Sequence, residues 1–331
     1  GHRVMLIPGA DFTRFGRQFR AGRLYTLGGT GTWEAWGEVV QPDDPSTTEV
    51  DEEQREYLLG DDGPAHEAPI VFPQGLDDDS RGNLYVSDSG YLGVPYYDLD
   101  AKATVTAPYT DPRAAAGLTM HTYHNSIRMI RAADGKIFTL RLTRNGQPHP
   151  VSAQDLRVHE SAAGKYLYVT DTMAHQVFRI RLPDDLSSLD TAIPASFEIE
   201  NVLGTFEKAG YVDTTISGAE YPTLSSVGGG LPRPHVLLTS PLSVAFDVDG
   251  NMLVSDYYRI HLIKASELAA LGSSTRVYPL AGAFDGYLDG DSRFVTVRPR
   301  YMHFDQYRRT VFFPDATRNR IYMLHTARGS L

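Results

Sequence analysis

The chain repeats one pattern of apolar and polar positions four times. In each copy a short apolar strand leads into a turn rich in Asp, Gly and Ser, and a second apolar strand then ends at an aspartate. Apolar runs on both sides of such a turn predict an antiparallel β-hairpin. The four copies occupy residues 75–88, 156–171, 244–256 and 302–315.

Further apolar segments follow each hairpin. A third strand is predicted from Asn125, Gln176, Arg259 and Asn319 onward. A fourth is predicted from the segments KIFTLRL, FEIENVLG and RVYPLAG, which start at residues 136, 197 and 276. Four strands in this order form an antiparallel meander, and its recurrence predicts an all-β fold, a β-propeller with these meanders as blades.

The two ends of the chain carry incomplete copies of the unit. Residues 4–29 match strands two to four, and residues 296–326 match strands one to three. Counting the N-terminal segment as a blade of its own gives five blades, and sharing strands between the ends gives a different closure, with six possible. Joining the first and last blades would remove open sheet edges. We therefore predict one propeller domain over residues 1–331.

The first copies of the repeat lie about eighty residues apart, well above the ~40 to 50 residues of an ordinary blade, and three insertions account for the excess. They lie at residues 30–69, 91–123 and 206–240. Long loops on a compact domain usually form lids or binding sites. The alternative is that one insertion contains a divergent extra blade.

The repeated motif resembles the NHL-repeat family of β-propellers. The resemblance lies in Asp79–Asp88, Asp249–Asp256, the triplet Asn319-Arg320-Ile321, the glycine segments 27–31 and 280–282, and the link-like string GAFDGYLDGDSRF at 282–294. It covers most of the chain outside the insertions. Propellers of this type serve as lyases, hydrolases and passive binding surfaces, so the resemblance implies the fold and leaves the activity open.

Composition narrows the possible partners. The 331 residues carry a formal net charge of -10, which argues against nucleic acid or an anionic membrane surface as the main partner. The chain has no cysteine, so disulfides, thiolate metal sites and cysteine nucleophiles are excluded. No apolar run approaches the ~20 residues needed to span a bilayer. The start of the sequence lacks a signal segment, but it also lacks an initiating Met, so the sequence leaves the cellular compartment open. It leaves the oligomeric state open as well.

Three histidines are candidate metal ligands. In a propeller blade, the links that enter strand one share a face with the loops between strands two and three. His66, His149 and His235 all lie in such links. Three imidazoles with an open fourth position are the ligand set of a catalytic zinc. We therefore expect these histidines to hold a divalent metal, preferably Zn, at the channel mouth. The alternative is that they are exposed turn residues that bind no metal.

Other residues of the same face are candidates for acid–base chemistry and substrate binding. His124 and His175 lie in loops of this face and are predicted as acid–base groups, further ligands or donors to the ligands. The NHL-type lyase that cleaves peptidyl-α-hydroxyglycine resembles this arrangement, with a zinc held by three histidines, an assisting tyrosine and arginine, and a structural calcium. The resemblance implies that Tyr91, Tyr123 or Tyr257 and Arg233 or Arg14 assist here. That lyase's disulfides are absent, and its histidine contexts are not reproduced.

Acidic turns raise a second metal possibility. Ca²⁺ prefers several oxygen ligands, and the runs Asp77–Asp79 and Asp285–Asp291 offer them, although solvated turns are the alternative. The aspartates that end the repeated strand are interpreted as turn caps that accept backbone N–H groups. These four are Asp88, Asp171, Asp256 and Asp315.

The sequence thus predicts a metal-dependent lyase or hydrolase that acts on a small polar or peptide-like substrate at the channel mouth. It contains no G-x-S-x-G, G-x-x-x-x-G-K-[ST] or H-E-x-x-H motif that would indicate another enzyme class. The competing hypothesis is a non-catalytic propeller that binds a protein or glycan through its tyrosine-rich insertions.

Overall fold

The computed structural model describes residues 2–31, 60–70, 72–89, 125–149, 151–186, 188, 192–220, 229–282, 297–305, 307–315 and 319–325. The chain divides into two compact units. Unit 1 comprises residues 1–153 with 181–199, and unit 2 comprises residues 154–180 with 200–331. No helix among the described residues is long and apolar enough to cross a membrane.

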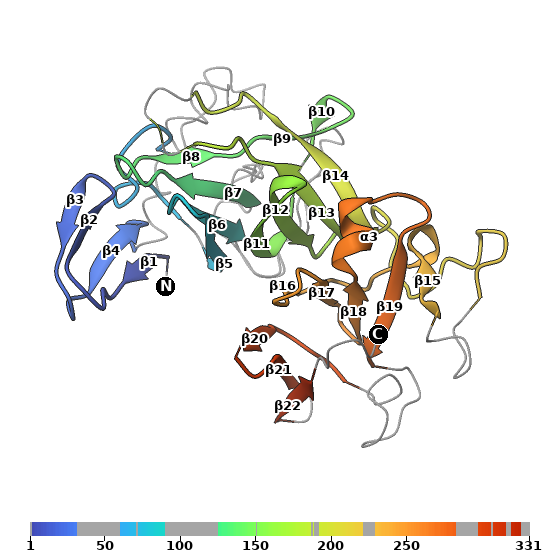
Figure 1. Ribbon diagram of the computed structural model, residues 1–331. Coiled ribbons are helices and arrows are strands. Elements are labelled where there is room, and N and C mark those ends of the chain that lie inside the picture. The colour runs from blue at the N-terminus through green and yellow to red at the C-terminus, as the bar shows by residue number, and fades with distance from the viewer. Residues whose placement is uncertain are drawn as a thin grey trace, which may run out of the picture. The chain divides into compact units, whose positions relative to one another are not determined.

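Unit 1 contains a complete blade (Figure 1). Its strands are hydrogen-bonded in chain order, and every neighbouring pair is antiparallel. The strands are β5 (Pro73–Asp78), β6 (Leu84–Ser89), β7 (Asn125–Ile130) and β8 (Ile137–Thr139). This is the meander that the repeat predicts.

Unit 2 repeats this order. The first meander consists of β11 (Ala153–Ser161), β12 (Gly164–Asp171), β13 (Gln176–Arg181) and β14 (Phe197–Gly204). The first residue of β11, the last residue of β13 and the start of β14 belong to unit 1. The second consists of β16 (Ser243–Phe246), β17 (Met252–Ser255), β18 (Ile260–Ile263) and β19 (Arg276–Ala281), with the short helix α3 (Ala265–Ala269) before β19. A last sheet has three strands, β20 (His303–Asp305), β21 (Thr310–Asp315) and β22 (Arg320–His325). The chain is therefore all-β and of the β-propeller type.

The hairpin turns are fixed by an aspartate and an asparagine four residues later. Asp79 Oδ1 accepts backbone N–H groups of Arg81 and Asn83, and its Oδ2 accepts the Asn83 side-chain amide at 3.0 Å. The Asn83 Oδ1 in turn accepts the N–H of Ala132, which follows β7. The motif therefore joins the turn of the hairpin to the third strand of its own blade.

The same arrangement recurs in unit 2. Asp247 Oδ1 accepts the N–H groups of Asp249 and Asn251, and its Oδ2 accepts the Asn251 amide at 2.8 Å. Asn251 Oδ1 accepts the N–H of Ala265. The conserved geometry of the two copies explains why the D-x-x-G-N pattern recurs in the sequence.

The interpretation of the strand-end aspartates as turn caps is confirmed for Asp256. Its Oδ1 accepts the N–H groups of Tyr258 at 2.9 Å and Arg259 at 2.7 Å, which closes the turn into strand three. Asp315 serves a related purpose, because its Oδ2 accepts the N–H of Arg298 in the link before β20. These carboxylates therefore satisfy backbone donors where a strand ends.

The prediction for the N-terminal segment is wrong. Instead of three successive strands, β1 (Val4–Leu6) pairs directly with β4 (Tyr25–Gly28). The hairpin of β2 (Phe12–Arg14) and β3 (Arg17–Phe19) is inserted between them and forms a separate sheet. Phe19 is buried in a core cluster with Val4 and Leu27, so the inserted hairpin contributes to the packing of unit 1.

A repeated glycine identifies β1 and β4 as strands three and four of a blade. Gly29 follows β4 with φ +86°, and a Cβ there would lie 2.2 Å from the carbonyl oxygen of His2. Gly204, after β14, has φ +80° and would meet the carbonyl oxygen of His175 at 2.3 Å. Gly282, after β19, shows the same relation to Tyr258. In each case strand four passes against the start of strand three so closely that only glycine fits.

The predicted fourth strand KIFTLRL is also divided. Strand β8 ends at Thr139, and Leu142–Arg144 forms β9, which turns back into β10 (Gln147–Pro148). The turn residues Asn145 and Gly146 have φ of +53° and +74°. An Asn-Gly pair with both φ positive is the strongest short-range hairpin signal, so this hairpin was readable from the sequence.

Two insertions are partly described. In residues 60–69, the Asp61 carboxylate accepts hydrogen bonds of 3.0 Å from the buried Arg128 of β7 and from Thr139 of β8. Within 206–240, the chain forms β15 (Leu231–Pro232), which pairs with β19, and the 3-10 helix η4 (Arg233–His235). The insertion at 91–123 lies outside the described residues.

Candidate functional site

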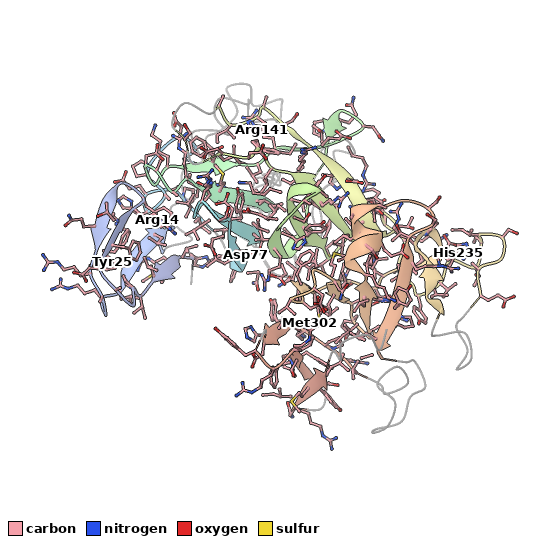
Figure 2. The ribbon with its side chains drawn as sticks, viewed as in Figure 1. Arg14, Tyr25, Asp77, Arg141, His235 and Met302 are labelled. Atoms are coloured by element: carbon pink, nitrogen blue, oxygen red, sulfur yellow. The ribbon has the colours of Figure 1, made fainter. Side chains whose placement is uncertain are left out.

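The three predicted metal ligands occur in different surroundings. His66 is exposed, and its Nε2 lies 3.6 Å from Oε1 of Glu67. His149 is buried, and its backbone N–H donates to the carbonyl of Leu142. His235 ends η4 (Figure 2), and its carbonyl accepts the N–H of Asp213 at 2.7 Å.

No group of three or more His, Asp or Glu residues that could hold a metal occurs in the described part of the chain. His66 and His149 belong to unit 1, and His235 belongs to unit 2. The Asp79 carboxylate of the acidic run 77–79 is used by its turn, and the run 285–291 lies outside the described residues. The zinc and calcium sites therefore stay predictions from the sequence.

His175 has a structural contact. It stands before β13 with φ +56°, and its Nδ1 accepts the backbone N–H of Ser240 at 3.0 Å. Burial lowers the pKa of His175, and the negative charge of Asp171 opposes part of this effect. The neutral imidazole therefore fixes the link that enters β16, while its role as an acid–base group remains a prediction.

Arg233 is partly buried and is used by the backbone around it. Its Nε donates to the carbonyl of Gly272, and its Nη1 donates to the carbonyl and side-chain oxygens of Asn201. Burial lowers the pKa of Arg233, and the positive charge of Arg179 adds to the effect. These contacts orient the side chain toward the protein, and its binding of a substrate anion remains a prediction.

The remaining predicted residues divide into two groups. Tyr91, Tyr123 and His124 lie outside the described residues. Tyr257 is in unit 2, where its hydroxyl accepts a hydrogen bond of 3.3 Å from Arg298 Nη1. Arg14 is in unit 1, where its guanidinium lies against Gly82 of the first hairpin turn. Neither of these described contacts of Tyr257 and Arg14 involves a predicted ligand.

A buried charged cluster lies at the end of β17. Asp256 Oδ2 is 3.4 Å from Arg259 Nη2 and 3.5 Å from His261 Nε2, and all three residues are fully buried. Burial alone would raise the pKa of Asp256, but Arg259 and His261 hold it below its usual value. The Arg259 guanidinium lies 4.0 Å from the ring centre of Tyr211, whose pKa burial raises to about 12. The cluster has the burial of a core and not of a substrate site.

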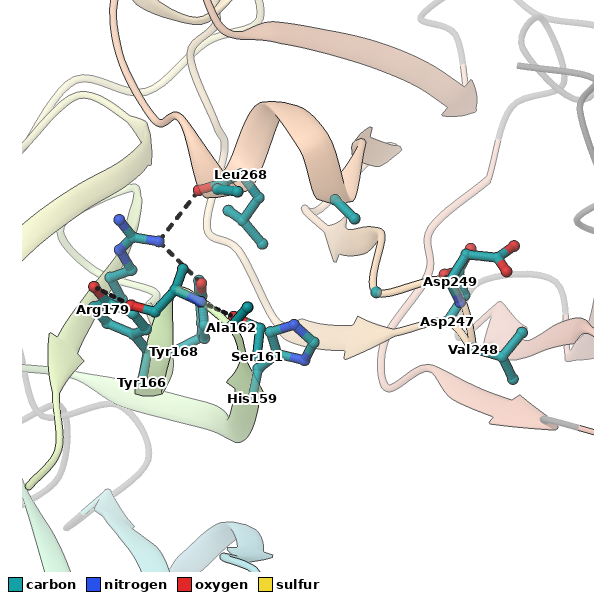
Figure 3. Close-up of a pocket in the computed structure, with 14 residues that line it drawn as sticks. His159, Ser161, Ala162, Tyr166, Tyr168, Arg179, Asp247, Val248, Asp249 and Leu268 are labelled. Carbon is teal, nitrogen blue, oxygen red and sulfur yellow. Dashed lines mark hydrogen bonds between the residues drawn. The ribbon is translucent and has the colours of Figure 1, made fainter. Parts of the chain in front are cut away.

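Unit 2 contains an open hollow of about 370 Å³ (Figure 3). It lies at the turn ends of the hairpins, between the β11–β12 hairpin on one side and the 247–250 turn and α3 on the other. Its wall includes His159, Tyr166, Tyr168, Arg179, Asp247 and Leu268. This is the opposite end of the blade strands from the one that the sequence pointed to.

Aromatic packing fixes the histidine of this hollow. The His159 ring, on β11, stacks on Phe246 of β16, with ring centres 4.1 Å apart and planes 5° apart. Tyr168 meets the same phenylalanine edge-on at 4.9 Å. Burial lowers the pKa of His159, so its imidazole is neutral at pH 7. A fixed, neutral imidazole can both donate and accept a hydrogen bond.

The arginine of the hollow is held on several sides. Arg179 Nε donates to Glu200 at 2.7 Å, and Nη1 donates to the Tyr168 hydroxyl at 3.1 Å, as Figure 3 shows for the latter. Its guanidinium also lies 4.3 Å from the ring centre of Tyr166. Burial alone would lower the pKa of Arg179, but the bonds to Glu200 and Tyr168 raise it. Arg179 therefore stays charged, and that charge is balanced.

The acidic residues of the opposite wall are also engaged. Asp247 caps its own turn, and Asp249 forms an ion pair with Arg309. The apolar side chains of Ala265, Leu268 and Ala269 complete the lining. The hollow thus combines aromatic and apolar surface with charged groups that already have ionic or hydrogen-bond partners.

Comparison with known proteins bears on this chain only weakly. No family model matches it, and no curated protein sequence matches it. Similar solved structures include an auxiliary nutrient binding protein from Bacteroides ovatus, at 13% identity over 78% of this chain with a TM-score of 0.42. A gluconolactonase from Xanthomonas campestris matches 98% of this chain and 79% of its own, at 12% identity and a TM-score of 0.40.

A luciferin-regenerating enzyme matches 77% of this chain at 13% identity, with a TM-score of 0.39. This chain spans 60% of the length of the nutrient binding protein and 62% of that of the luciferin-regenerating enzyme. At these TM-scores the likenesses assign no function to this chain.

Proposed function

We propose that this propeller binds a neutral, hydroxyl-rich ligand, a carbohydrate, in the hollow lined by His159, Tyr166 and Arg179. The observation that carries the proposal is that this hollow offers aromatic and polar surface while Arg179 and Asp249 are already paired with Glu200 and Arg309, and Asp247 is occupied by its own turn. This is the glycan-binding form of the non-catalytic hypothesis, located at a different place from the tyrosine-rich insertion.

Charge balance favours an uncharged ligand. An anionic ligand would have to compete with Glu200 for Arg179, and a cationic one with Arg309 for Asp249. Hydroxyl groups can instead add hydrogen bonds to such pairs without displacing either partner. The pairs also hold their side chains in place before the ligand arrives, which lowers the entropic cost of binding.

Aromatic and apolar groups complement the other face of a sugar. Sugar rings carry C–H groups on one face and hydroxyls around the edge, so they suit sites with aromatic rings beside a few polar groups. Tyr166 supplies a ring and a hydroxyl at the edge of the hollow, and Leu268 and the alanines supply apolar contact. His159 adds a neutral donor and acceptor.

A glycan array that contains neutral and acidic members, followed by calorimetry on the neutral sugars retained, tests the proposal. His159→Ala should weaken binding at least about tenfold, and Tyr166→Phe less, because truncating a central group costs more than removing one hydrogen bond. Tyr257→Phe, in the same unit but outside the hollow, should leave the affinity unchanged. If the protein binds no neutral glycan on the array, or if His159→Ala binds with unchanged affinity, the proposal is refuted.

A further inference from the structure

A second hollow adjoins the first in unit 2. It has a volume of about 490 Å³, and Phe246, Val248, His303 and Tyr307 are among the residues that line it. Asp247 and Val248 line both hollows. The turn that follows β16 is therefore the common wall of two neighbouring cavities.

The common wall is fixed from both sides. On the side of the first hollow, Phe246 stacks on His159, while the same phenylalanine lines the second hollow. On the other side, Asp249 is bonded to Arg309 in the turn between β20 and β21. Val248 lies between these contacts with 46% of its surface exposed. Of the two residues that line both hollows, Asp247 is buried, so the exposed part of the common wall is the apolar side chain of Val248.

The second hollow has the same chemical character as the first. Tyr307 is 90% exposed at a turn whose Asp305 accepts the N–H groups of Tyr307 and Arg308. Asp305 also pairs with the Arg308 guanidinium at 2.7 Å. An exposed aromatic ring on a capped turn is a surface on which a ring can stack, and here again the neighbouring charges are paired.

We infer that the two hollows bind one elongated ligand, a linear oligosaccharide that passes over Val248. The inference rests on the proposed function and extends it from one sugar to a chain. Each hollow is near the lower end of the ~300 to 1,000 Å³ range of ligand pockets, so each suits a short segment. Two weak sites joined through one ligand give a higher affinity than either alone.

A peptide fits these walls less well than an oligosaccharide. Extended peptides are recognised largely through free backbone groups of a sheet edge. Here the walls are hairpin turns, and the backbone N–H groups of Asp249, Asn251, Tyr307 and Arg308 already donate to Asp247 and Asp305. Recognition therefore depends on side chains, as in sugar binding.

Calorimetry with the malto-, cello- and chito-oligosaccharides, from monosaccharide to hexasaccharide, tests the inference on the full chain. In the series that binds, affinity should rise at least about tenfold with chain length and then level off. Tyr307→Ala should remove this gain and leave the shortest ligand unchanged, whereas Tyr307→Phe should retain it. His159→Ala should weaken short and long ligands alike.

The outcomes separate the two proposals. Equal affinity for short and long oligosaccharides, or an unchanged hexasaccharide affinity in Tyr307→Ala, would overturn the elongated ligand and leave the single carbohydrate site intact. Binding of none of the three series, together with an empty glycan array, would overturn both. Binding of an unrelated peptide library that depends on Tyr307, without any oligosaccharide, would also overturn the inference.

Discussion

The imidazole Nδ1 of His175 accepts a hydrogen bond of 3.0 Å from the backbone N–H of Ser240, immediately before Pro241. In unit 1, His2 Nδ1 accepts the N–H of Phe72 at 3.4 Å, immediately before Pro73. Both histidines have φ near +57°, and both donors have φ near +48°. The same histidine contact thus fixes the link into a first strand in each unit.

His175→Ala should lower the free energy of unfolding by about 1 to 3 kcal/mol, because it leaves the Ser240 N–H without its acceptor. Alanine inherits the left-handed conformation that His175 already adopts at φ +56°, so the lost hydrogen bond is the main cost. His175→Asn should lower the free energy of unfolding much less, since asparagine keeps a hydrogen-bond acceptor and tolerates positive φ. Asn319 indeed stands at the corresponding place before β22 with φ +52°. Urea unfolding measures the difference.

The exposed His303 provides the control for this pair, and His303→Ala should leave the urea midpoint unchanged. Equal midpoints for His175→Ala and the wild type would show that the contact contributes nothing to stability.

Stability should fall as the pH drops below about 6.5. Burial lowers the folded-state pKa of His2, His159 and His175, so the unfolded chain, with a histidine pKa of about 6.5, takes up protons first. Their contribution is complete above that pH and is lost between it and the lower folded pKa values. Urea midpoints from pH 7.5 to 5 record the trend.

His175→Asn should flatten part of this dependence, which separates the histidine effect from that of the buried Asp155. Burial raises the pKa of Asp155, so its own contribution has the opposite sign, greater stability at lower pH. An identical pH profile for His175→Asn and the wild type would contradict the assignment to His175.

Gly204→Ala should destabilise the fold by at least about 3 kcal/mol, because a Cβ would collide with the His175 carbonyl and φ is +80°. Gly218 has a similar φ of +78°, but nothing lies within 4 Å of its Cβ position. Gly218→Ala should therefore cost only roughly 1 kcal/mol, the backbone penalty alone. Similar unfolding midpoints for the two variants would mean that strands three and four do not approach as described.

Metal content tests the lyase or hydrolase reaction predicted from the sequence. If His66, His149 and His235 share a zinc ion, the purified protein should contain one equivalent of zinc per chain, and His149→Ala should lose it. Ser161→Ala, at the edge of the hollow, is the matched control and should not alter the metal content. Wild-type protein without stoichiometric metal, or full retention in His149→Ala, would rule out this site.

The fold was predictable from local chemistry, and its exceptions have local causes. Turns such as Asp79 to Asn83 are closed by side chains a few residues away, so their pattern is visible in the sequence. The N-terminal error arose because apolar alternation marks β1 to β4 as strands without revealing which of them pair. In the structure, the close approach of Gly29 to the carbonyl of His2 shows that β4 pairs with β1, and the sequence does not reveal this approach.

The candidate site was not predictable in the same way. His159, Tyr168 and Arg179 come from three different strands, and only packing shows that they line one hollow. His175 is singled out in the sequence by its place in a loop between strands two and three, yet in the structure that place reflects a backbone contact. A histidine at such a position in the repeat can therefore have a structural role without taking part in catalysis.

The Asp–Asn turn also bears on how such a chain can lengthen. Asp79 and Asn83 find all the partners described for them within residues 79–132, and Asp247 and Asn251 find theirs within 247–265. A duplicated segment from hairpin to third strand would therefore bring its own turn partners to any new position. The His175 contact depends on the following link, so a copied blade would also need a neighbour that supplies a donor before its first strand.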